Sequence, residues 1–229
     1  NQKSDILDKF DFTNSSPNNY FFYSMLYREF KYPKKFNKLD NGKFNDKYDD
    51  IKYFGIKDKD EELAKQIKVL YYNNEDDFAI KLLTTSNDEV IINKNPKGNN
   101  FREIYNNITS KSKGYKDNEF TIYRDYFKMP YLSLNVIKEY KELEGQPIKD
   151  SEGNLIEIGT ALQTIKFTID DVGGKIKSEA GMDVMKSSIE DNKSKRYFYV
   201  DKTFAIFLKE TSKDKPYFAA RVADIRKFQ

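Results

Sequence analysis

The chain has 229 residues, 38% of them hydrophobic and 15% aromatic, which is enough material for one sizeable core or two small ones. Its 40 basic and 37 acidic residues nearly balance, so the net charge of +3 gives no strong field for nucleic acid or for a membrane surface. The sequence contains neither Cys nor His, which excludes disulfides, thiol nucleophiles and the usual general base, and we expect no cofactor and no metal site.

Apolar and aromatic runs in the first half of the chain predict strands. Residues Asn19–Tyr27 form such a run after a polar, turn-forming segment, which is typical of a strand buried on both faces. The polar stretch from Asn37 to Asp60 contains only a short candidate at Ile51–Phe54. Two alternating segments, Gln66–Tyr72 and Phe78–Leu83, flank an acidic turn and predict a β-hairpin.

The second half mixes helix and strand signals. Apolar residues at helical spacing predict a helix over Asn99–Thr109, with a polar loop over Ser110–Gly114 after it. A second short amphipathic helix is expected over Asn135–Leu143. Alternation predicts strands at Phe120–Tyr123, Phe127–Leu134 and Ile156–Ile169. Strands dominate, so the expected fold class is α+β, and the lack of repeats and linkers favours a single domain over residues 1–229.

Five segments, in the right order, resemble characteristic patterns of the serpin family. Ala161–Gly174 resembles the strand that feeds the hinge of the serpin reactive-centre loop. The other four segments are Ser24–Tyr32, Phe127–Leu132, Val200–Leu208 and Pro216–Val222. The resemblance covers the chain from about Pro17 to Val222. It departs from the family where Ser24 replaces Asn, Tyr32 replaces Trp, Gln163 replaces His and Ala220 replaces Gly.

The resemblance implies a serpin-like fold, with mainly antiparallel β-sheets, a few short helices and a long reactive-centre-like loop over residues 173–199. It implies a protease inhibitor whose cleaved loop inserts into the central sheet and traps a target protease of the serine or cysteine type. Ser24 and Gln163 stand in its sheet-opening region, where each side chain can donate and accept a hydrogen bond. The alternative is a non-inhibitory serpin-like binding or scaffold protein.

An inserting segment needs side chains that alternate with period two, and the loop sequence meets this need. One set is small or apolar: Gly174, Ile176, Ser178, Ala180, Met182 and Val184. The other set is small or charged: Gly173, Lys175, Lys177, Glu179, Gly181 and Asp183. The expected hinge consists of Asp171, Gly173, Gly174, Ile176, Ser178 and Ala180. A permanently paired strand would show the same alternation, and the charged hinge residues argue against fast insertion.

Counting along the loop, as the family does, from Asp171 places the scissile residue at Ser187, with Lys186 suited to a trypsin-like protease and Met185 to a chymotrypsin- or elastase-like one. The basic cluster Lys193–Arg196 is expected to be a solvated flank. Asp170 is also expected to flank solvent together with its neighbour Asp171. Adjacent strand residues point to opposite faces, so these two carboxylates do not predict an enzyme.

The resemblance finds no counterpart before Asn1 for the family's N-terminal helical part, so the domain is expected to be incomplete at its N-terminus. A fragment, a reduced natural form and a separate chain that supplies the N-terminal segment as a partner all stay open. No apolar stretch approaches a membrane span, and the first residues show no signal-like core, so any secretion signal is expected upstream. An extracellular location is favoured over a cytoplasmic one, and Asn107–Thr109 would accept a glycan in a eukaryotic secretory route.

Overall fold

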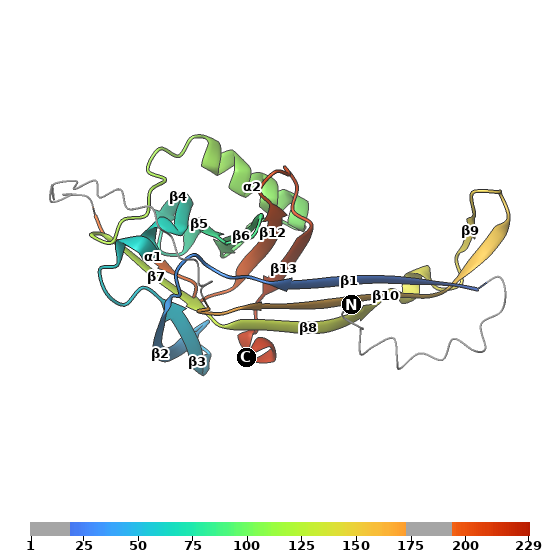
Figure 1. Ribbon diagram of the computed structural model, residues 1–229, viewed down its shortest axis with the longest axis horizontal. Helices are drawn as coiled ribbons and strands as arrows, with labels where there is room; N and C mark the ends of the chain where they lie inside the picture. Colours follow the sequence, from blue (N-terminus) through green and yellow to red (C-terminus); the bar gives the residue numbers. More distant parts are fainter. Residues whose placement is uncertain (1–18, 173–193) are drawn as a thin grey trace. The chain divides into compact units, whose positions relative to one another are not determined.

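A computed structural model describes residues 19–172 and 194–229 (Figure 1), and the chain divides into two compact units. The smaller unit consists of Asn1–Arg28 and Leu134–Phe167, and the larger one of Glu29–Ser133 and Thr168–Gln229. The unit boundaries fall within or beside strands rather than in linkers. The expectation of a single domain stays a prediction.

The smaller unit is built on a four-stranded sheet with the order β1-β10-β8, and β9 also pairs with β10. Its elements are β1 (Asn19–Glu29), β8 (Leu132–Glu139), the 3-10 helix η2 (Lys141–Leu143), β9 (Pro147–Lys149) and β10 (Leu155–Ile169). In the first part of β10, the buried residues Ile156 and Ile158 alternate with the exposed Leu155 and Glu157, as a strand with one covered face requires. The predicted strands over Asn19–Tyr27 and Ile156–Ile169 are confirmed.

The predicted helix over Asn135–Leu143 is wrong. Its first residues, through Glu139, belong to β8, which is hydrogen-bonded to β10, and only Lys141–Leu143 turn in a short 3-10 helix. A short apolar pattern does not distinguish helix from strand by itself, and the neighbouring strand supplies the backbone partners here.

The larger unit contains a four-stranded sheet, in the order β11-β7-β3-β2, and a five-stranded sheet, in the order β13-β12-β6-β5-β4. The strands of the first are β2 (Asn37–Phe44), β3 (Tyr48–Gly55), β7 (Asp125–Pro130) and β11 (Arg196–Tyr199). Those of the second are β4 (Ile67–Asn74), β5 (Asp77–Leu83), β6 (Asp88–Lys94), β12 (Phe204–Glu210) and β13 (Phe218–Val222). The helices are α1 (Glu61–Lys65), α2 (Phe101–Lys113) and the 3-10 helix η3 (Ile225–Phe228).

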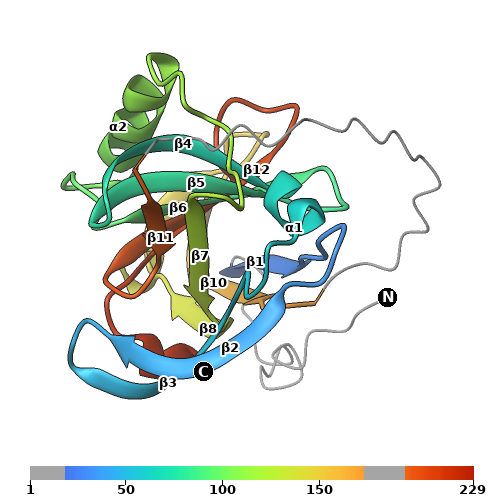
Figure 2. The ribbon, with the colours of Figure 1, turned by 90° about the vertical axis from the view of Figure 1, so that its left-hand side faces the viewer.

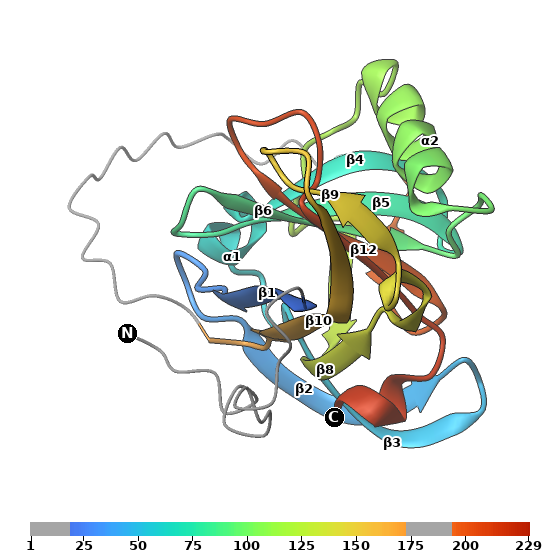
Figure 3. The same ribbon diagram turned by 90° about the vertical axis from the view of Figure 1, so that its right-hand side faces the viewer.

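The five-stranded sheet carries α2 on one face (Figures 2 and 3). Ile104 and Ile108 of α2 are buried in a cluster with Tyr71, Ile91 and Phe207 from three strands of the sheet. Each buried isoleucine contributes about 1.5–3 kcal/mol through its removal from water. The two sheets of this unit meet through aromatic rings, because the rings of Phe78 and Phe198 lie 5.2 Å apart. The ring of Tyr72 lies 4.9 Å from that of Phe198.

The predicted β4–β5 hairpin is confirmed, with Ile67 opposite Leu82 and Tyr72 opposite Phe78. A second hairpin, β2–β3, lies in the polar stretch where only Ile51–Phe54 was expected as a strand. Its turn residues Asn45 and Asp46 have φ values of 55° and 54°, a left-handed conformation that Asn and Asp tolerate and that matches the twist of a hairpin.

Two further expectations differ from the structure. Helix α2 continues to Lys113, through most of the segment expected as a polar loop, because its exposed face needs no apolar residues. Residues 122–124 form a turn rather than a strand, and the next strand begins at Asp125. The backbone N–H groups of Arg124 and Asp125 both donate to the carbonyl of Thr121, which closes that turn.

Candidate functional site at the two ends of the predicted loop

Residues 173–193, which make up most of the predicted loop, lie outside the described residues. This range contains the three scissile candidates, Met185, Lys186 and Ser187. It also contains the predicted hinge positions other than Asp171, namely Gly173, Gly174, Ile176, Ser178 and Ala180. Both flanks of this segment are described, and both belong to the larger unit. The predicted loop over 173–199 was too long at its C-terminal end, since Arg196–Tyr199 is strand β11, paired in parallel with β7. This pairing is visible in Figure 2.

The N-terminal flank is fixed by the side chain of Asp171, which is only 3% exposed. The hydroxyl of Tyr131 donates to Asp171 Oδ1 at 2.7 Å, and the ammonium of Lys35 lies 3.1 Å from Oδ2. The expectation that Asp171 flanks solvent is wrong. The strand alternation around Asp171 could not reveal its two partners, Tyr131 and Lys35, because both are distant in sequence.

The backbone around Asp171 is also held. The N–H of Phe36 donates to the carbonyl of Asp171 at 3.0 Å, and the N–H of Tyr32 donates to the carbonyl of Val172 at 3.4 Å. The Val172 N–H in turn donates to the carboxylate of Asp170 at 2.8 Å. The chain therefore enters the predicted loop from a fixed position.

Burial by itself raises the pKa of the Asp171 carboxyl, but the Tyr131 hydrogen bond and the Lys35 charge outweigh it and hold that pKa below its usual value. The same contact, together with burial as the larger cause, raises the pKa of the Tyr131 hydroxyl. Asp171 is therefore an ionised acceptor and Tyr131 a neutral donor at neutral pH.

The C-terminal flank is fixed by Arg196, the first residue of β11, which is 4% exposed. Its Nε donates to Asp125 Oδ1 at 2.8 Å and its Nη2 to Asp125 Oδ2 at 2.7 Å, the two-bond geometry that a guanidinium and a carboxylate favour. Its Nη1 donates to the Tyr115 hydroxyl at 3.0 Å and to the Asp117 carbonyl at 2.9 Å. Nη2 also donates to the Glu119 carbonyl at 2.7 Å, so all three nitrogens have acceptors.

A second arginine completes this cluster. Arg124 donates to both carboxylate oxygens of Asp117, at 2.8 and 2.5 Å, while Arg196 Nη1 lies 3.3 Å from the same carboxylate. Burial lowers the pKa of the Arg196 guanidinium, but the Asp125 hydrogen bonds and the neighbouring carboxylates raise it above its ordinary value. The expectation that Lys193–Arg196 is a solvated flank is therefore wrong for Arg196, while Lys195 is exposed.

The predicted sheet-opening residues lie on neighbouring strands of the smaller unit, Ser24 on β1 and Gln163 on β10. The hydroxyl of Tyr140 donates to Gln163 Oε1 at 2.8 Å. The side chain of Ser24 is outside the description. Because β1 and β10 are hydrogen-bonded neighbours, no strand lies between them in this structure.

Sequence reasoning missed Tyr131, Lys35 and Asp125 as partners of the loop ends. Asp125 and Arg196 are 71 residues apart, and Tyr131 and Asp171 are 40 residues apart. Pairs at such separations leave no local spacing pattern. The only available signal was the presence of charged residues next to apolar strand positions, as in Arg196-Tyr197-Phe198.

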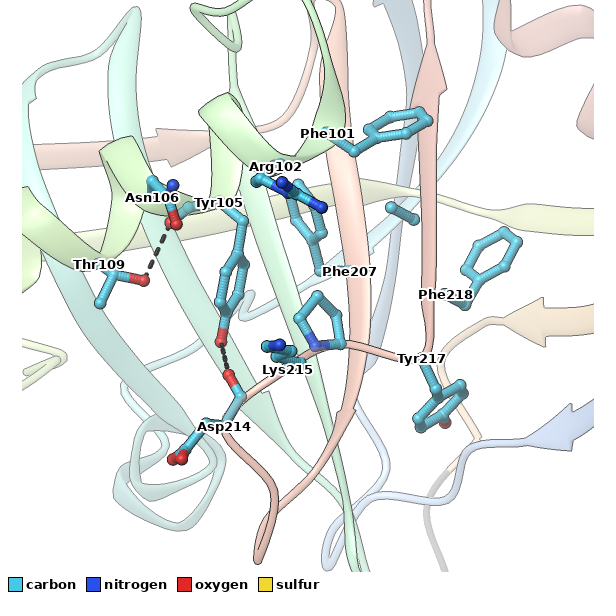
Figure 4. A pocket seen from close by; sticks show the side chains of 12 residues that line it. Phe101, Arg102, Tyr105, Asn106, Thr109, Phe207, Asp214, Lys215, Tyr217 and Phe218 are labelled. Atoms are coloured by element: carbon cyan, nitrogen blue, oxygen red, sulfur yellow. Dashed lines mark hydrogen bonds between the residues drawn. The ribbon is translucent and has the colours of Figure 1, made fainter.

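A separate surface pocket of about 720 Å³ lies in the larger unit between α2 and the β12–β13 connection (Figure 4). Aromatic rings of Phe101, Tyr105 and Phe207 line it, and the Tyr105 hydroxyl donates to the carbonyl of Asp214 at 3.1 Å. Neither Asp171 nor Arg196 lines this pocket.

Among residues 19–172 and 194–229, no group of three or more acidic side chains is placed to hold a metal ion. In the same described ranges, no helix combines the length and the apolar character that a membrane span requires.

No protein-family model matches the chain, and no curated protein matches it in sequence. Solved structures do match it. The serine protease inhibitor serpin-12 of Manduca sexta aligns with a TM-score of 0.59 and 12% identity over 90% of this chain. Serpin48 of the insect Tenebrio molitor gives 0.54 and 14% over 88%, and maspin gives 0.58 and 11% over 88%.

The chain spans just over half the length of these structures, 56% of serpin-12, 55% of Serpin48 and 56% of maspin. The predicted mixture of mainly antiparallel sheets and few helices is what the two units contain. The structural likeness and the order of these elements together establish that the described part of the chain has a serpin-like fold.

Proposed function

We propose that this chain is part of a protease inhibitor of the trapping type, which offers residues 173–195 as a cleavable loop and does not itself catalyse a reaction. A target protease of the serine or cysteine type cleaves the loop at Met185, Lys186 or Ser187. The upstream part of the loop then enters the sheet between β1 and β10 as a new strand. The acyl-linked protease moves with it and is trapped.

The observation that carries this proposal is the direct pairing of β1 with β10, the strand that leads into the predicted loop. In the proposed mechanism, this direct pairing is the state of the sheet before insertion. A segment with two different faces follows β10 in the sequence, and its small or apolar set, including Ile176 and Ala180, suits a buried face. Burying Ile176, Met182 and Val184 would contribute about 1.5–3 kcal/mol each to the inserted state.

The two fixed flanks fit the same proposal. Asp171 and Arg196 hold the chain on either side of the segment, and in this proposal the segment between them is a loop with two anchored ends. A protease binds such a loop with a smaller loss of conformational entropy than a free peptide requires.

The test is to mix the chain with trypsin, chymotrypsin, elastase and papain and to look for a covalent complex that survives boiling on a denaturing gel. A complex, together with a rise in melting temperature of the cleaved protein, supports trapping. Mass spectrometry of the released C-terminal peptide identifies the scissile bond. Cleavage without a complex and without a rise in melting temperature contradicts the proposal.

The second candidate is a non-inhibitory serpin-like binding or scaffold protein. Its supporting observation is the hinge sequence, where Lys175, Lys177 and Glu179 introduce charges into the segment that must insert first. Slow insertion would let the acyl-enzyme hydrolyse before the protease is trapped.

A further inference from the structure

Three tyrosines and two lysines share one face of strands β7 and β11, which we call the tyrosine face: Tyr126, Tyr197, Tyr199, Lys128 and Lys195. In the parallel pairing of the two strands, Tyr197 lies opposite Tyr126 and Tyr199 opposite Lys128. The residues between them, Phe127 and Phe198, are buried on the other face. Strand alternation therefore directs the tyrosines away from the core.

The side chains of the tyrosine face form a continuous contact chain. The rings of Tyr126 and Tyr197 are stacked with their centroids 5.0 Å apart, and the rings of Tyr197 and Tyr199 are 5.5 Å apart. The ammonium of Lys195 lies 5.7 Å from the Tyr126 ring centroid, and that of Lys128 lies 4.9 Å from the Tyr199 centroid. Tyr126 is 36% exposed although it is stacked.

The two lysines of this face differ in their surroundings. Lys195 is exposed, whereas the ammonium of Lys128 lies 4.5 Å from the ring centroid of the buried Tyr53. Burial lowers the pKa of Lys128, and the charge of the nearby Asp201 carboxylate opposes this. Within the described ranges, neither Lys128 nor Lys195 has a carboxylate within ion-pair distance. The bordering carboxylate of Asp201 is 2.7 Å from the ammonium of Lys94. Lys195 therefore presents its positive charge beside the Tyr126 ring, which suits a protein surface that carries acidic groups.

Tyr126 is exposed, and Tyr197 and Tyr199 are partly exposed. Protein interfaces are rich in tyrosine and in cations, because a tyrosine buries a large area at a small entropic cost and keeps a polar tip. A self-stacked pair such as Tyr126 and Tyr197 is also held in one orientation before binding. This reduces the side-chain entropy that an interface must otherwise lose.

The position of the tyrosine face next to the predicted loop indicates which protein would bind it. Lys195 is the last residue before β11, and it lies eight residues after Ser187, so an extended chain between them would span at most about 29 Å. A protease bound at the scissile residue is therefore within reach of the tyrosine face, and a contact area of about 800 Å² on each partner is usual for such complexes.

We propose that the tyrosine face is a docking surface for the target protease, specifically for acidic residues beside its active-site cleft, and this inference rests on the proposed function. Tyr126 and Tyr197 would supply the buried contact, and Lys195 would pair with a carboxylate of the protease. The face would raise the rate at which the protease engages the loop. It would leave unchanged the partition between trapping and hydrolysis, which occurs after cleavage.

The test compares the wild-type chain with Tyr126→Ala and Lys195→Glu in cleavage by trypsin, chymotrypsin, elastase and papain. For a protease that uses the face, each substitution is expected to lower kcat/KM for loop cleavage by about tenfold. The loss of rate in Lys195→Glu should shrink in high salt. The matched controls are Tyr123→Ala, a tyrosine that is 55% exposed elsewhere on the unit, and Lys213→Glu on the β12–β13 turn. Both are expected to match the wild type.

The rate of loop cleavage and the yield of covalent complex are measured separately. The docking inference and the inhibitor proposal can therefore be contradicted independently. If every variant stays within twofold of the wild type for every protease that cuts the loop, the docking inference is wrong. If cleavage slows as expected but no covalent complex appears, the docking surface stands and the inhibitor proposal fails. If none of the four proteases cuts the loop, both are wrong for these protease classes. Thermal melts confirm that each variant is folded.

Discussion

Arg196 and Asp125 face each other through two nearly parallel hydrogen bonds of 2.8 and 2.7 Å, although 71 residues separate them in the chain. The Asp125 side chain is fully buried and that of Arg196 is 5% exposed. Two strands are joined at this point, and one of them follows the predicted loop directly. The pair therefore links the loop end to the core of the larger unit.

Replacing Arg196 with Ala is expected to lower the free energy of unfolding by about 3 kcal/mol, because the buried Asp125 loses both guanidinium hydrogen bonds. Among the described residues, it keeps only the hydrogen bond from the Thr121 N–H at 2.7 Å and the more distant Arg124 at 3.7 Å. Urea denaturation followed by circular dichroism measures this change. The matched control is Arg226→Ala, which removes an exposed arginine paired with Asp224 at 2.8 Å and should leave the midpoint nearly unchanged. Equal effects of the two substitutions would contradict a special role for the buried pair.

Replacing Asp171 with Asn is expected to alter the pH dependence of stability. The folded-state pKa of Asp171 lies below its unfolded value, so its contribution is present above about pH 4 and is lost as pH falls through the folded pKa. The variant should be less stable than the wild type at pH 7, and its stability should fall less steeply below about pH 4. Urea midpoints at several pH values test this.

The Tyr131→Phe variant is the control for Asp171, because it keeps the carboxylate and the Lys35 ion pair but removes the 2.7 Å hydrogen bond. We expect a slope between those of the wild type and Asp171→Asn, and a loss of about 1–2 kcal/mol at neutral pH. Parallel curves for the wild type and Asp171→Asn would show that this carboxylate does not titrate differently in the two states.

Replacing Lys186 with Ala is expected to reduce trypsin cleavage within the loop by about 100-fold, because the trypsin specificity pocket requires a basic side chain. Cleavage by chymotrypsin or elastase, which would use Met185, should be unaffected. Mass mapping of the two fragments measures both rates. Unchanged trypsin cleavage would show that trypsin cuts the loop after another basic residue and not after Lys186.

Insertion is tested by placing a charge on the face of the loop that is expected to be buried. Ala180→Asp should abolish the rise in melting temperature after cleavage, because an unpaired carboxylate would be carried into the sheet. Lys177→Asp changes the opposite, solvent-facing set and should preserve most of the rise. If the two variants behave alike, the period-two assignment of the loop is wrong.

The strands with strong local signals were predictable from the sequence. Continuous apolar runs identified β1, and alternating residues identified β10 and the β4–β5 hairpin, because such patterns reflect burial on a pleated surface. The predicted helix at Asn135–Leu143 was wrong because such a short mixture of apolar and polar residues fits either period, and pairing with β10 made most of it a strand. The β2–β3 hairpin was missed because its strands are mostly polar and partly exposed.

The sequence by itself determined the strand-rich class, the order of the segments that resemble serpins, and the alternating pattern of residues 174–184. Only the tertiary structure decided that Asp171 and Arg196 are buried anchors rather than solvated flanks. A buried charge is tolerated when its partners surround it, and those partners, Tyr131 and Lys35 for one and Asp125 and Asp117 for the other, come from distant segments. Spacing along the chain carries no trace of such contacts, because they exist only after the strands have been brought together.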